Sequence, residues 1–411
     1  MLTAIPRYGA RVIPNTEQII EALGASGELV EGPHLTAFEH ALAARVGARH
    51  AISASYGRMA FLYLLDALGL PPGSEIIFPA LTFWVVPEMA RVAGLTPVFA
   101  DVDPVTFNLD PAALERAITP RTRAVVPTHL YGLPCDMGAI LDIARAHGLR
   151  VIEDCAHALG ATWRGQPVGT IGDAGFFSFQ LLKPLNTYGG GMAVTNDDAV
   201  AARLHQRSRQ EPPPSVSEVR RRLRLGRVQR IAIRPGVFSA SLYPMLLAGS
   251  VVQATPDVYL WEKIRSLDPL PDSYRRRYAN VQAAIGLEAL RHLDHWTAET
   301  VAHAHTLDRS LADTAIDTPG VPADRSHVFY QYAIYAAHRD EVVRRCLRRG
   351  VDVETLHVDV CTRLSLFGDH HTAAPGADKA ATAIQLPVYS SLSTDGVRRV
   401  ARVVRQVVAA P

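Results

Sequence analysis

The chain has 411 residues, of which 48% are hydrophobic and 20% are charged, and its formal net charge is +2. This composition is typical of a soluble globular protein and gives no general case for nucleic-acid binding. The four cysteines form no C-x-x-C pair, the histidines lack the spacing of zinc ligands, and the N-terminus has no apolar signal core. We therefore expect a cytoplasmic protein with free thiols and no metal site, built as one large domain and a smaller one.

Residues 15–50 are predicted to be helical and amphipathic, and a further helix is expected before Gly69. Thr16 opens one candidate helix, and His34–Val46 places apolar residues along one stripe of a second. The run Ser53–Gly69 starts with small residues and continues as an apolar helix. A turn that leads into a helix favours an anion, because the first N–H groups of the helix have no partner within it. A plain capped helix explains the same residues equally well.

Apolar runs typical of strands alternate with helical segments between residues 75 and 195. The expected strands are Glu75–Phe78, Thr96–Ala100, Ala124–Pro127, Arg150–Glu153, Ala174–Phe179 and Met192–Thr195. The expected helices are Val85–Ala93, Pro111–Ile118 and Met137–His147. This alternation predicts an α/β fold with a mostly parallel sheet covered by helices on both faces. Neither G-x-G-x-x-G nor a P-loop motif is present, which disfavours dinucleotide and P-loop nucleotide binding.

Two residues in this region carry the chemistry. Asp154 lies at the carboxyl end of an expected strand, where α/β sheets bind ligands. Lys183 is one of only three lysines among 42 basic residues, and its neighbours are apolar. An amine can lose its proton and attack a carbonyl, whereas a guanidinium cannot. Because burial lowers the pKa of a lysine, Lys183 is a candidate nucleophile for Schiff-base chemistry.

The composition changes at about residue 203. Residues 203–234 contain ten arginines and two acids, and the apolar stretch Val237–Ala254 follows. Pro244 and Gly249 interrupt this stretch, so a transmembrane helix is disfavoured. Two interpretations stay open: a helical insertion packed on the protein or at a subunit interface, and a peripheral contact of residues 215–255 with an anionic inner-membrane face.

The remainder of the chain is predicted to form a long helix and a smaller α+β unit. Helices are expected over Tyr274–His292, Thr297–Leu311, Arg339–Arg349 and Thr394–Val408, strands over Tyr330–Tyr335 and Val351–Leu356, and a loop over Phe367–Ala380. The predicted domains are therefore residues 1–270, with an insertion at about 203–260, and residues 271–411.

Several runs, in this order, resemble the DegT/DnrJ/EryC1/StrS family. They are P-A-L-T-F-W (79–84), P-V-F-A-D-V-D (97–103), H-L-Y-G-L-P-C-D-M (129–137), E-D-C-A-H-A-L-G (153–160), G-D-A-G-F-F-S-F-Q-L-L-K (172–183), G-G-G-M-A-V-T-N-D (189–197), V-Q-A-A-I-G-L (281–287) and L-P-V-Y (386–389). Members of this family are sugar aminotransferases of fold type I that use pyridoxal 5′-phosphate (PLP). The resemblance implies a large PLP-binding domain, a smaller C-terminal α+β domain, and a homodimer with shared active sites.

The resemblance implies roles for residues at the cofactor ring. Lys183 would form the Schiff base with the cofactor aldehyde, and Asp154 would pair with the pyridine nitrogen. His157 matches a position expected near the ring hydroxyl, with a purely structural histidine as the alternative. Phe83 matches the aromatic residue expected to stack on the ring, although it could be a core residue and Trp84 could take its place.

The resemblance also implies a phosphate site, where this chain departs from the family pattern. Ser178 matches a phosphate ligand, and Gly57 and Arg58 lie in the turn that cradles the phosphate. Arg58 stands where a threonine is usual. Arg275 replaces the asparagine of an Asn-x-Arg motif that reaches the phosphate of the neighbouring subunit, whereas Arg277 matches the arginine. Arg58 and Arg275 could bind the phosphate or the substrate.

The function implied is a PLP-dependent aminotransferase. It would move an amino group from an amino acid, glutamate or glutamine, to a keto group of a sugar-like acceptor such as a nucleotide sugar. One alternative is the same chemistry on a lipid-linked or hydrophobic keto acceptor at the membrane. Another is a PLP-dependent sugar dehydratase, but such family members carry histidine at the lysine position. A third is a regulatory or membrane-associated binding protein built on the same fold.

Overall fold

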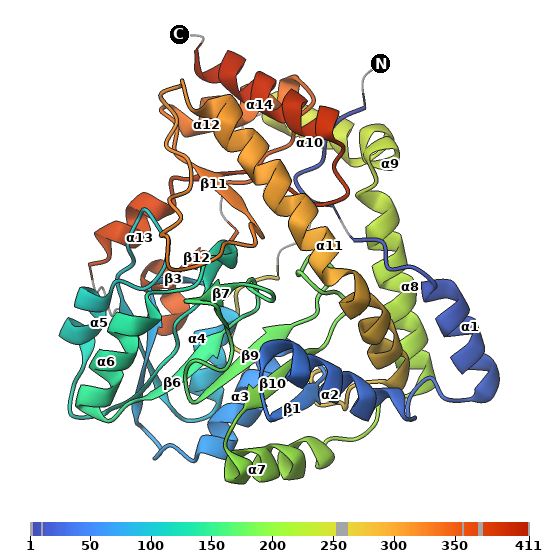
Figure 1. Ribbon diagram of the computed structural model, residues 1–411, viewed down its shortest axis with the longest axis vertical. Helices are drawn as coiled ribbons and strands as arrows, with labels where there is room; N and C mark the ends of the chain where they lie inside the picture. Colours follow the sequence, from blue (N-terminus) through green and yellow to red (C-terminus); the bar gives the residue numbers. More distant parts are fainter. Residues whose placement is uncertain (1–2, 10, 252–261, 356, 369–372, 410–411) are drawn as a thin grey trace.

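The computed structural model describes residues 3–9, 11–251, 262–355, 357–368 and 373–409 (Figure 1). Its centre is a seven-stranded sheet with the order β1-β10-β9-β6-β5-β2-β4. β10 runs antiparallel to β1 and β9, and the other neighbours pair in parallel. The predicted mostly parallel α/β sheet is therefore confirmed. The strands are β1 (His50–Ala54), β2 (Glu75–Pro79), β4 (Thr96–Ala100), β5 (Thr122–Val125), β6 (Arg150–Asp154), β9 (Ala174–Ser178) and β10 (Gly191–Thr195).

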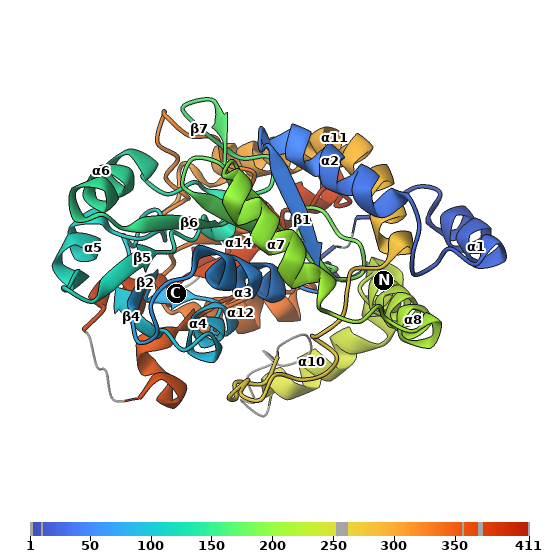
Figure 2. The same ribbon diagram turned by 90° about the horizontal axis from the view of Figure 1, so that it is seen from below.

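Helices cover both faces of this sheet, because successive side chains of a buried strand point to opposite sides. Ile76 and Phe78 of β2 pack with the helices of one face, α3, α4 and α7, whereas Ile77 packs with α5 and α6 on the other. Figure 2 shows α7 and α3 lying over the sheet beside β1. The covering helices are α3 (Gly57–Leu68), α4 (Val85–Val92), α5 (Pro111–Ala117), α6 (Met137–His147) and α7 (Asp198–Arg209).

One long helix, α11 (Asn280–Leu311), joins the two parts of the molecule. It packs on α2 (His34–Val46) beside the sheet and on α14 (Thr394–Val408) in the C-terminal part, and Figure 1 shows it running between them. The predicted break between residues 292 and 297 is wrong. Neither glycine nor proline interrupts this stretch, and its buried side chains Leu293 and Trp296 continue the packed face. The predicted start at Tyr274 is also wrong, because the backbone remains extended at Ala279.

The C-terminal part has a buried core of its own, in which α12, α14 and a short antiparallel pair of strands, β11 and β13, pack together. The predicted strand Val351–Leu356 is wrong: Val351 and Glu354 form isolated bridges to Ile5 and Gln385, and Leu356 lies outside the described residues. Part of the predicted loop 367–380 is helical, and residues 369–372 lie outside the described residues. The domain boundary at 270/271 stays a prediction. The elements are β11 (Tyr332–Ile334), β13 (Ile384–Leu386), α12 (Arg339–Arg348) and α13 (Pro375–Ala380).

The described part of the Arg-rich insertion is largely helical and lies along one side of the molecule next to α1 (Thr16–Ser26) (Figures 1 and 2). Its helices are α8 (Val216–Ala232), α9 (Pro235–Ala240) and α10 (Leu242–Val251). The side chains of Leu225, Val228 and Met245 are exposed by 57%, 57% and 71%. Residues 252–255, the end of the predicted membrane contact, lie outside the described residues. No helix within the described ranges has the length and the apolar character needed to cross a membrane.

Four shorter strands and three single turns of 3-10 helix complete the elements of the described ranges. The pairing of β12 with β3 matters for the site, because it brings the C-terminal segment around His357 next to Phe83. The elements are β3 (Leu81–Thr82), β7 (Thr162–Trp163), β8 (Gln166–Pro167), β12 (Asp359–Val360), η1 (Leu130–Gly132), η2 (Cys361–Arg363) and η3 (Ser365–Phe367).

Candidate active site

The structure gathers the predicted site residues, except Arg275, around one pocket of about 230 Å³. The sheet explains this placement, because β6 ends at Asp154, β9 ends at Ser178, and α3 begins at Gly57 directly after β1. β1, β9 and β6 run in the same direction in the order β1-β10-β9-β6, so these ends lie at one edge of the sheet. The pocket residues that had been predicted are Gly57, Arg58, Phe83, Asp154, His157, Ser178 and Lys183.

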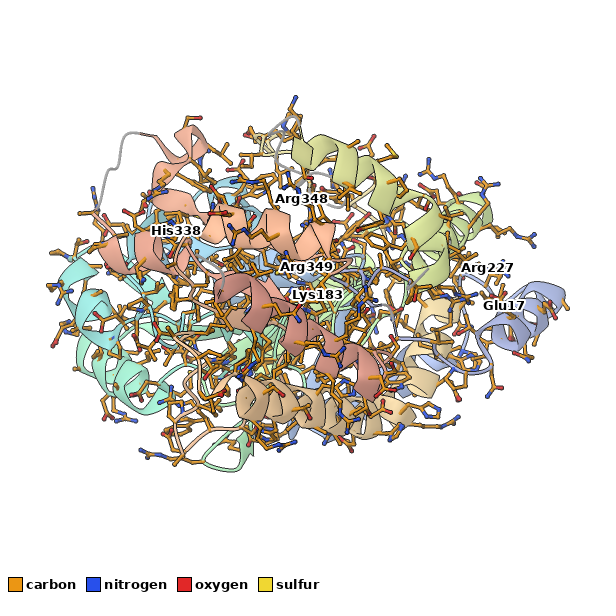
Figure 3. All side chains as sticks on the ribbon, turned by 90° about the horizontal axis from the view of Figure 1, so that it is seen from above. Glu17, Lys183, Arg227, His338, Arg348 and Arg349 are labelled. Carbon is orange, nitrogen blue, oxygen red and sulfur yellow. The ribbon has the colours of Figure 1, made fainter. Side chains whose placement is uncertain are left out.

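Lys183 lies in the connection between β9 and β10, near the middle of the molecule (Figure 3). Its backbone N–H donates to the carbonyl of Gln180 (3.0 Å), and its Nζ lies 5.0 Å from the centre of the Tyr330 ring. Burial lowers the pKa of Lys183 from 10.5 to about 8; the charge of Asp154 acts in the opposite direction, and Arg58 adds to the lowering. The amine is therefore far more often neutral, and so nucleophilic, than an exposed lysine would be.

Asp154 is almost fully buried at the end of β6. Its Oδ1 accepts a hydrogen bond from the backbone N–H of Ala156 (3.0 Å). Burial raises the pKa of Asp154 to about 6, although the Ala156 hydrogen bond and the charge of Lys183 both oppose this rise. A buried carboxylate of this kind gains much from a cationic partner, such as a protonated ring nitrogen.

His157 stacks on Tyr330 with ring centres 4.2 Å apart, and its Nδ1 has no partner among the described residues. Burial holds the pKa of His157 well below 6.5, and the charges of Lys183 and His357 add to this effect. A neutral imidazole with a buried, unsatisfied nitrogen is ready to bond a polar group of a ligand. Phe83 also lines the pocket, whereas its neighbour Trp84 is buried in the core.

The other end of the pocket is built to receive an anion. Gly57 opens α3, whose first N–H groups have no partner within the helix. A Cβ at position 57 would lie 2.9 Å from the Cβ of Ser178 and 3.1 Å from the carbonyl oxygen of Phe177, so only glycine lets the helix start approach β9 this closely. Among the described residues, the Ser178 hydroxyl forms no hydrogen bond. These donors suit a phosphate group.

Arg58 forms an ion pair and hydrogen bonds with other residues of the chain. Its two terminal nitrogens donate to the carboxylate of Glu262 (2.9 and 2.7 Å), and Nη1 also reaches the hydroxyl of Tyr274 (2.6 Å). Burial opposes ionisation of Glu262, but the hydrogen bond and the charge of Arg58 hold its pKa below the ordinary value. The arginine at the usual threonine position is therefore a neutralised cation, which leaves the phosphate end less positive than the sequence suggests.

Arg275 is the predicted site residue that the structure leaves outside the pocket. Its side chain is 57% exposed, and its Nε lies 3.7 Å from Glu211. Arg277 of the same motif bonds Glu31 (2.7 Å), also away from Lys183. Within one chain, Arg275 therefore makes no contact with this pocket, and the expectation that it reaches the phosphate of the neighbouring subunit stays a prediction.

Five of the polar pocket residues that sequence reasoning missed are Tyr8, Gln180, Glu262, Tyr330 and His357. The Tyr330 hydroxyl lies 2.9 Å from Nε2 of His357. Glu262 follows the part of the insertion that lies outside the described residues. Only Gln180 stands close in sequence to a recognised motif, so no local signal could have indicated the others.

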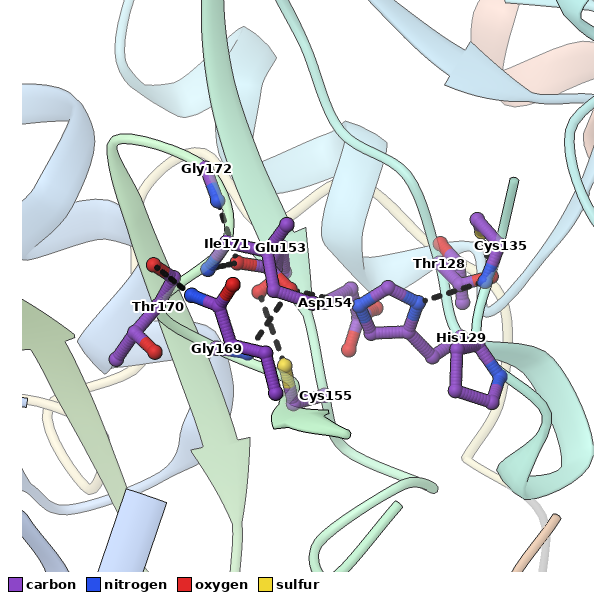
Figure 4. Close-up of polar contacts among 12 residues, drawn as sticks. Thr128, His129, Cys135, Glu153, Asp154, Cys155, Gly169, Thr170, Ile171 and Gly172 are labelled. Carbon is purple, nitrogen blue, oxygen red and sulfur yellow. Dashed lines mark hydrogen bonds and ion pairs between the residues drawn. The ribbon is translucent and has the colours of Figure 1, made fainter. Parts of the chain in front are cut away.

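A buried polar cluster stands directly behind Asp154 (Figure 4). The Glu153 carboxylate accepts hydrogen bonds from the backbone N–H groups of Gly169 (2.8 Å), Ile171 (2.7 Å) and Gly172 (2.8 Å). Its fourth partner is Nε2 of His129 (3.0 Å), whose Nδ1 accepts the N–H of Cys135 (3.0 Å). The hydrogen-bond pattern thus places the imidazole proton on Nε2.

The same cluster has the residue types of a metal site, because His129, Glu153 and Cys155 offer donor atoms within 4.8 Å of one another. Both Glu153 oxygens and both His129 nitrogens are already occupied by hydrogen bonds. Burial raises the pKa of the Cys155 thiol to about 12, so it stays protonated and a poor ligand. The chemistry of the cluster therefore fits a structural network. The His370–His371 pair lies outside the described residues.

The residues present fit PLP. A low-pKa amine and a buried carboxylate share one pocket, and the unsatisfied Nδ1 of His157 offers a bond to a ring substituent. The close approach at Gly57 and the free hydroxyl of Ser178 supply a phosphate cradle. A bound PLP would explain each of these features.

We expect the rate at which the cofactor-free protein captures PLP covalently to rise with pH through about 8. The neutral amine is the reactive form, and its fraction increases as pH passes the pKa. Absorbance of the covalently held cofactor, followed after rapid mixing at successive pH values, measures this rate. A rise that starts only near 10.5 would contradict the effect of burial.

Comparison with known proteins gives one family. The DegT/DnrJ/EryC1/StrS aminotransferase family matches residues 13–213 and 254–405. Residues 214–253, which contain α8, α9 and α10, lie between these matched ranges.

Individual relatives are similar over almost their whole length. A pleiotropic regulatory protein of Geobacillus stearothermophilus is 33% identical over 390 residues, which are 93% of this chain and 91% of that protein. A UDP-N-acetyl-3-dehydro-alpha-D-glucosamine 3-aminotransferase of Acidithiobacillus ferrooxidans is 32% identical over 412 residues, 98% of each chain. The crystal structure of S. venezuelae DesV, in complex with a ketimine intermediate, has a TM-score of 0.76 and 29% identity, and covers 97% of this chain and 95% of that one.

Proposed function

Because the chain belongs to the DegT/DnrJ/EryC1/StrS aminotransferase family, we propose that it transfers an amino group from glutamate or glutamine to the keto group of a nucleotide sugar. The protein is a PLP-dependent transaminase of fold type I. The observation that carries the proposal is the buried Lys183 amine, with a pKa of about 8, in one pocket with Asp154. The UDP-sugar named for the Acidithiobacillus relative supports the acceptor class.

The pocket residues have separate roles in the proposed reaction. PLP, when bound, supplies a ring that withdraws electrons from the substrate carbon. We propose that the Lys183 amine holds the cofactor and then carries a proton to and from that carbon, which a lysine of lowered pKa does well near neutral pH. The Asp154 carboxylate would hold the proton on the ring nitrogen. His157 would bond the ring oxygen through its free Nδ1, and Phe83 would contact the ring.

Donor and acceptor react in the same pocket, so they bind in turn and the kinetics are of the ping-pong type. The start of α3 and Ser178 would hold the phosphate. Glu262 neutralises Arg58, so the arginine orients this end of the pocket without adding a net charge.

We propose a homodimer as the working unit. Arg275 is exposed and lies outside the pocket of its own chain, which suits a residue that completes the site of a second copy. Sedimentation of the purified protein distinguishes a dimer from a monomer.

The function is tested in two half-reactions. The holoenzyme is first mixed with single amino acids, and the change in cofactor absorbance identifies the donor. The aminated enzyme is then mixed with keto nucleotide sugars, and the masses of the products are measured by mass spectrometry. We expect glutamate or glutamine to react and one acceptor to gain an amino group. Release of 2-oxoglutarate without an aminated sugar would favour a dehydratase, and a holoenzyme that reacts with no amino acid would contradict the proposal.

A further inference from the structure

A second pocket, of about 440 Å³, lies beside the pocket of Lys183. Gln180, Leu181 and Gln229 line both, so the two cavities share a wall. These three side chains therefore mark the boundary between the two pockets, so a ligand bound next to Lys183 lies beside the second pocket.

One wall of the second pocket is α8, from which Arg221, Arg222, Leu225 and Gln229 line the cavity. This helix falls in residues 214–253, between the ranges that the family matches. The α8 wall thus lies outside the ranges that the family matches and next to the Lys183 pocket.

The lining carries an excess of positive charge. Four arginines, Arg221, Arg222, Arg276 and Arg277, face one acid, Glu218. Arg276 and Arg277 are paired, with Glu218 (3.2 Å) and Glu31 (2.7 Å). Among the described residues, Arg221 and Arg222 have no acidic partner, so their charges are available to a ligand.

Arg222 is the better placed of the two free cations. It is half-buried, and its guanidinium lies 4.9 Å from the Tyr56 ring. Its one hydrogen bond to a described residue is a long contact with the carbonyl of Ser55 (3.4 Å). Arg58 of the Lys183 pocket lies over the same ring at 5.4 Å. Tyr56 therefore stands between the two sites, and stacking holds the Arg222 fork in place.

We propose that the second pocket binds the phosphate or diphosphate of the acceptor substrate, with Arg222 as the principal ligand and Arg221 as the second. A planar guanidinium without an acidic partner matches two phosphate oxygens at once. The inference deepens the proposed function, since it assumes that the acceptor carries phosphate. The amino donor carries none, so the pocket serves one half-reaction only.

The test replaces Arg222 by glutamine in the holoenzyme and uses Arg224→Gln as the matched control. Arg224 lies on the same helix, is exposed and does not line the pocket. Binding of UDP is measured by calorimetry. We expect Arg222→Gln to weaken it about 10- to 100-fold, as for the loss of a charged hydrogen bond, and Arg224→Gln to change it little. The rate of the donor half-reaction with glutamate or glutamine should be unchanged in both variants.

The outcomes separate this inference from the proposed function. Two results would overturn the inference: UDP binding that is unaltered in both Arg222→Gln and the double variant Arg221→Gln/Arg222→Gln, or no UDP binding to the parent protein. In either case, an intact donor half-reaction would still support the proposed transaminase function. An equal loss of the donor half-reaction in Arg222→Gln would also overturn it, because the arginine would then act on the catalytic pocket. Inorganic pyrophosphate and farnesyl diphosphate identify the source: the probe that loses most affinity in the variant resembles the natural ligand.

Discussion

Replacement of Lys183 by alanine is expected to reduce transamination by at least about 10⁴-fold, because one side chain both holds the cofactor and moves the proton. Its pocket offers no second lysine among the described residues. The measurement has two parts: the rate of amino transfer, and the mass of the chain after borohydride reduction in the presence of PLP. The parent chain should gain the mass of the reduced cofactor, and the variant should not.

Two further variants make this result specific. Lys183→Arg keeps the charge but cannot supply a neutral amine, so we expect it to be as inactive as the alanine variant. Lys379→Ala removes a lysine of α13 outside the pocket and should keep the activity. Undiminished transamination by Lys183→Ala would refute the assignment of the lysine.

Replacement of Glu153 by glutamine is expected to lower the free energy of unfolding by at least about 3 kcal/mol, the value of one or two hydrogen bonds to a buried charge. The carboxylate accepts four N–H groups on its two oxygens. Glutamine has one oxygen, so its amide N–H₂ would face donors at the other position (Figure 4). Urea unfolding of the purified variant measures the loss.

The control is Asp142→Asn, which removes an exposed acid that pairs with Arg145 on α6. An exposed pair of this kind contributes little, so its unfolding midpoint should stay close to that of the parent. If Glu153→Gln does not yield soluble protein, His129→Gln tests the same network, because it removes one donor from the carboxylate and leaves the three backbone donors. A midpoint unchanged in either Glu153→Gln or His129→Gln would contradict the structural role.

The position of this network links stability to chemistry. Glu153 precedes Asp154 on β6, and its three backbone partners form the turn before β9. The carboxylate therefore holds together the two neighbouring strands whose ends carry Asp154 and Ser178 into the pocket. Loss of the Glu153 carboxylate should therefore disturb the Lys183 pocket as well as the core.

Local periodicity accounts for the parts of the fold that were predicted well. The sheet strands between residues 75 and 195 and the helices between them are short, and each pattern is complete within one element. The sequence predicts two helices in place of α11, because polar residues around 292–297 weaken the apolar stripe. In the structure, the packing of Leu293 and Trp296 keeps the helix continuous. The sequence around Val351 and Glu354 is typical of a strand. The two residues form separate bridges, however, because their partners, Ile5 and Gln385, belong to different segments.

The sequence by itself determined the chemical identity of the site. A lone lysine among apolar residues, an aspartate at a strand end and ordered family motifs all report on local structure, so they could be interpreted without knowing the contacts. The tertiary structure alone decided the surroundings: the pairing of Glu262 with Arg58, the entry of Tyr330 and His357 into the pocket, and the outward position of Arg275. These contacts join segments far apart in the chain, and no periodicity of the sequence encodes which distant side chains will pack together.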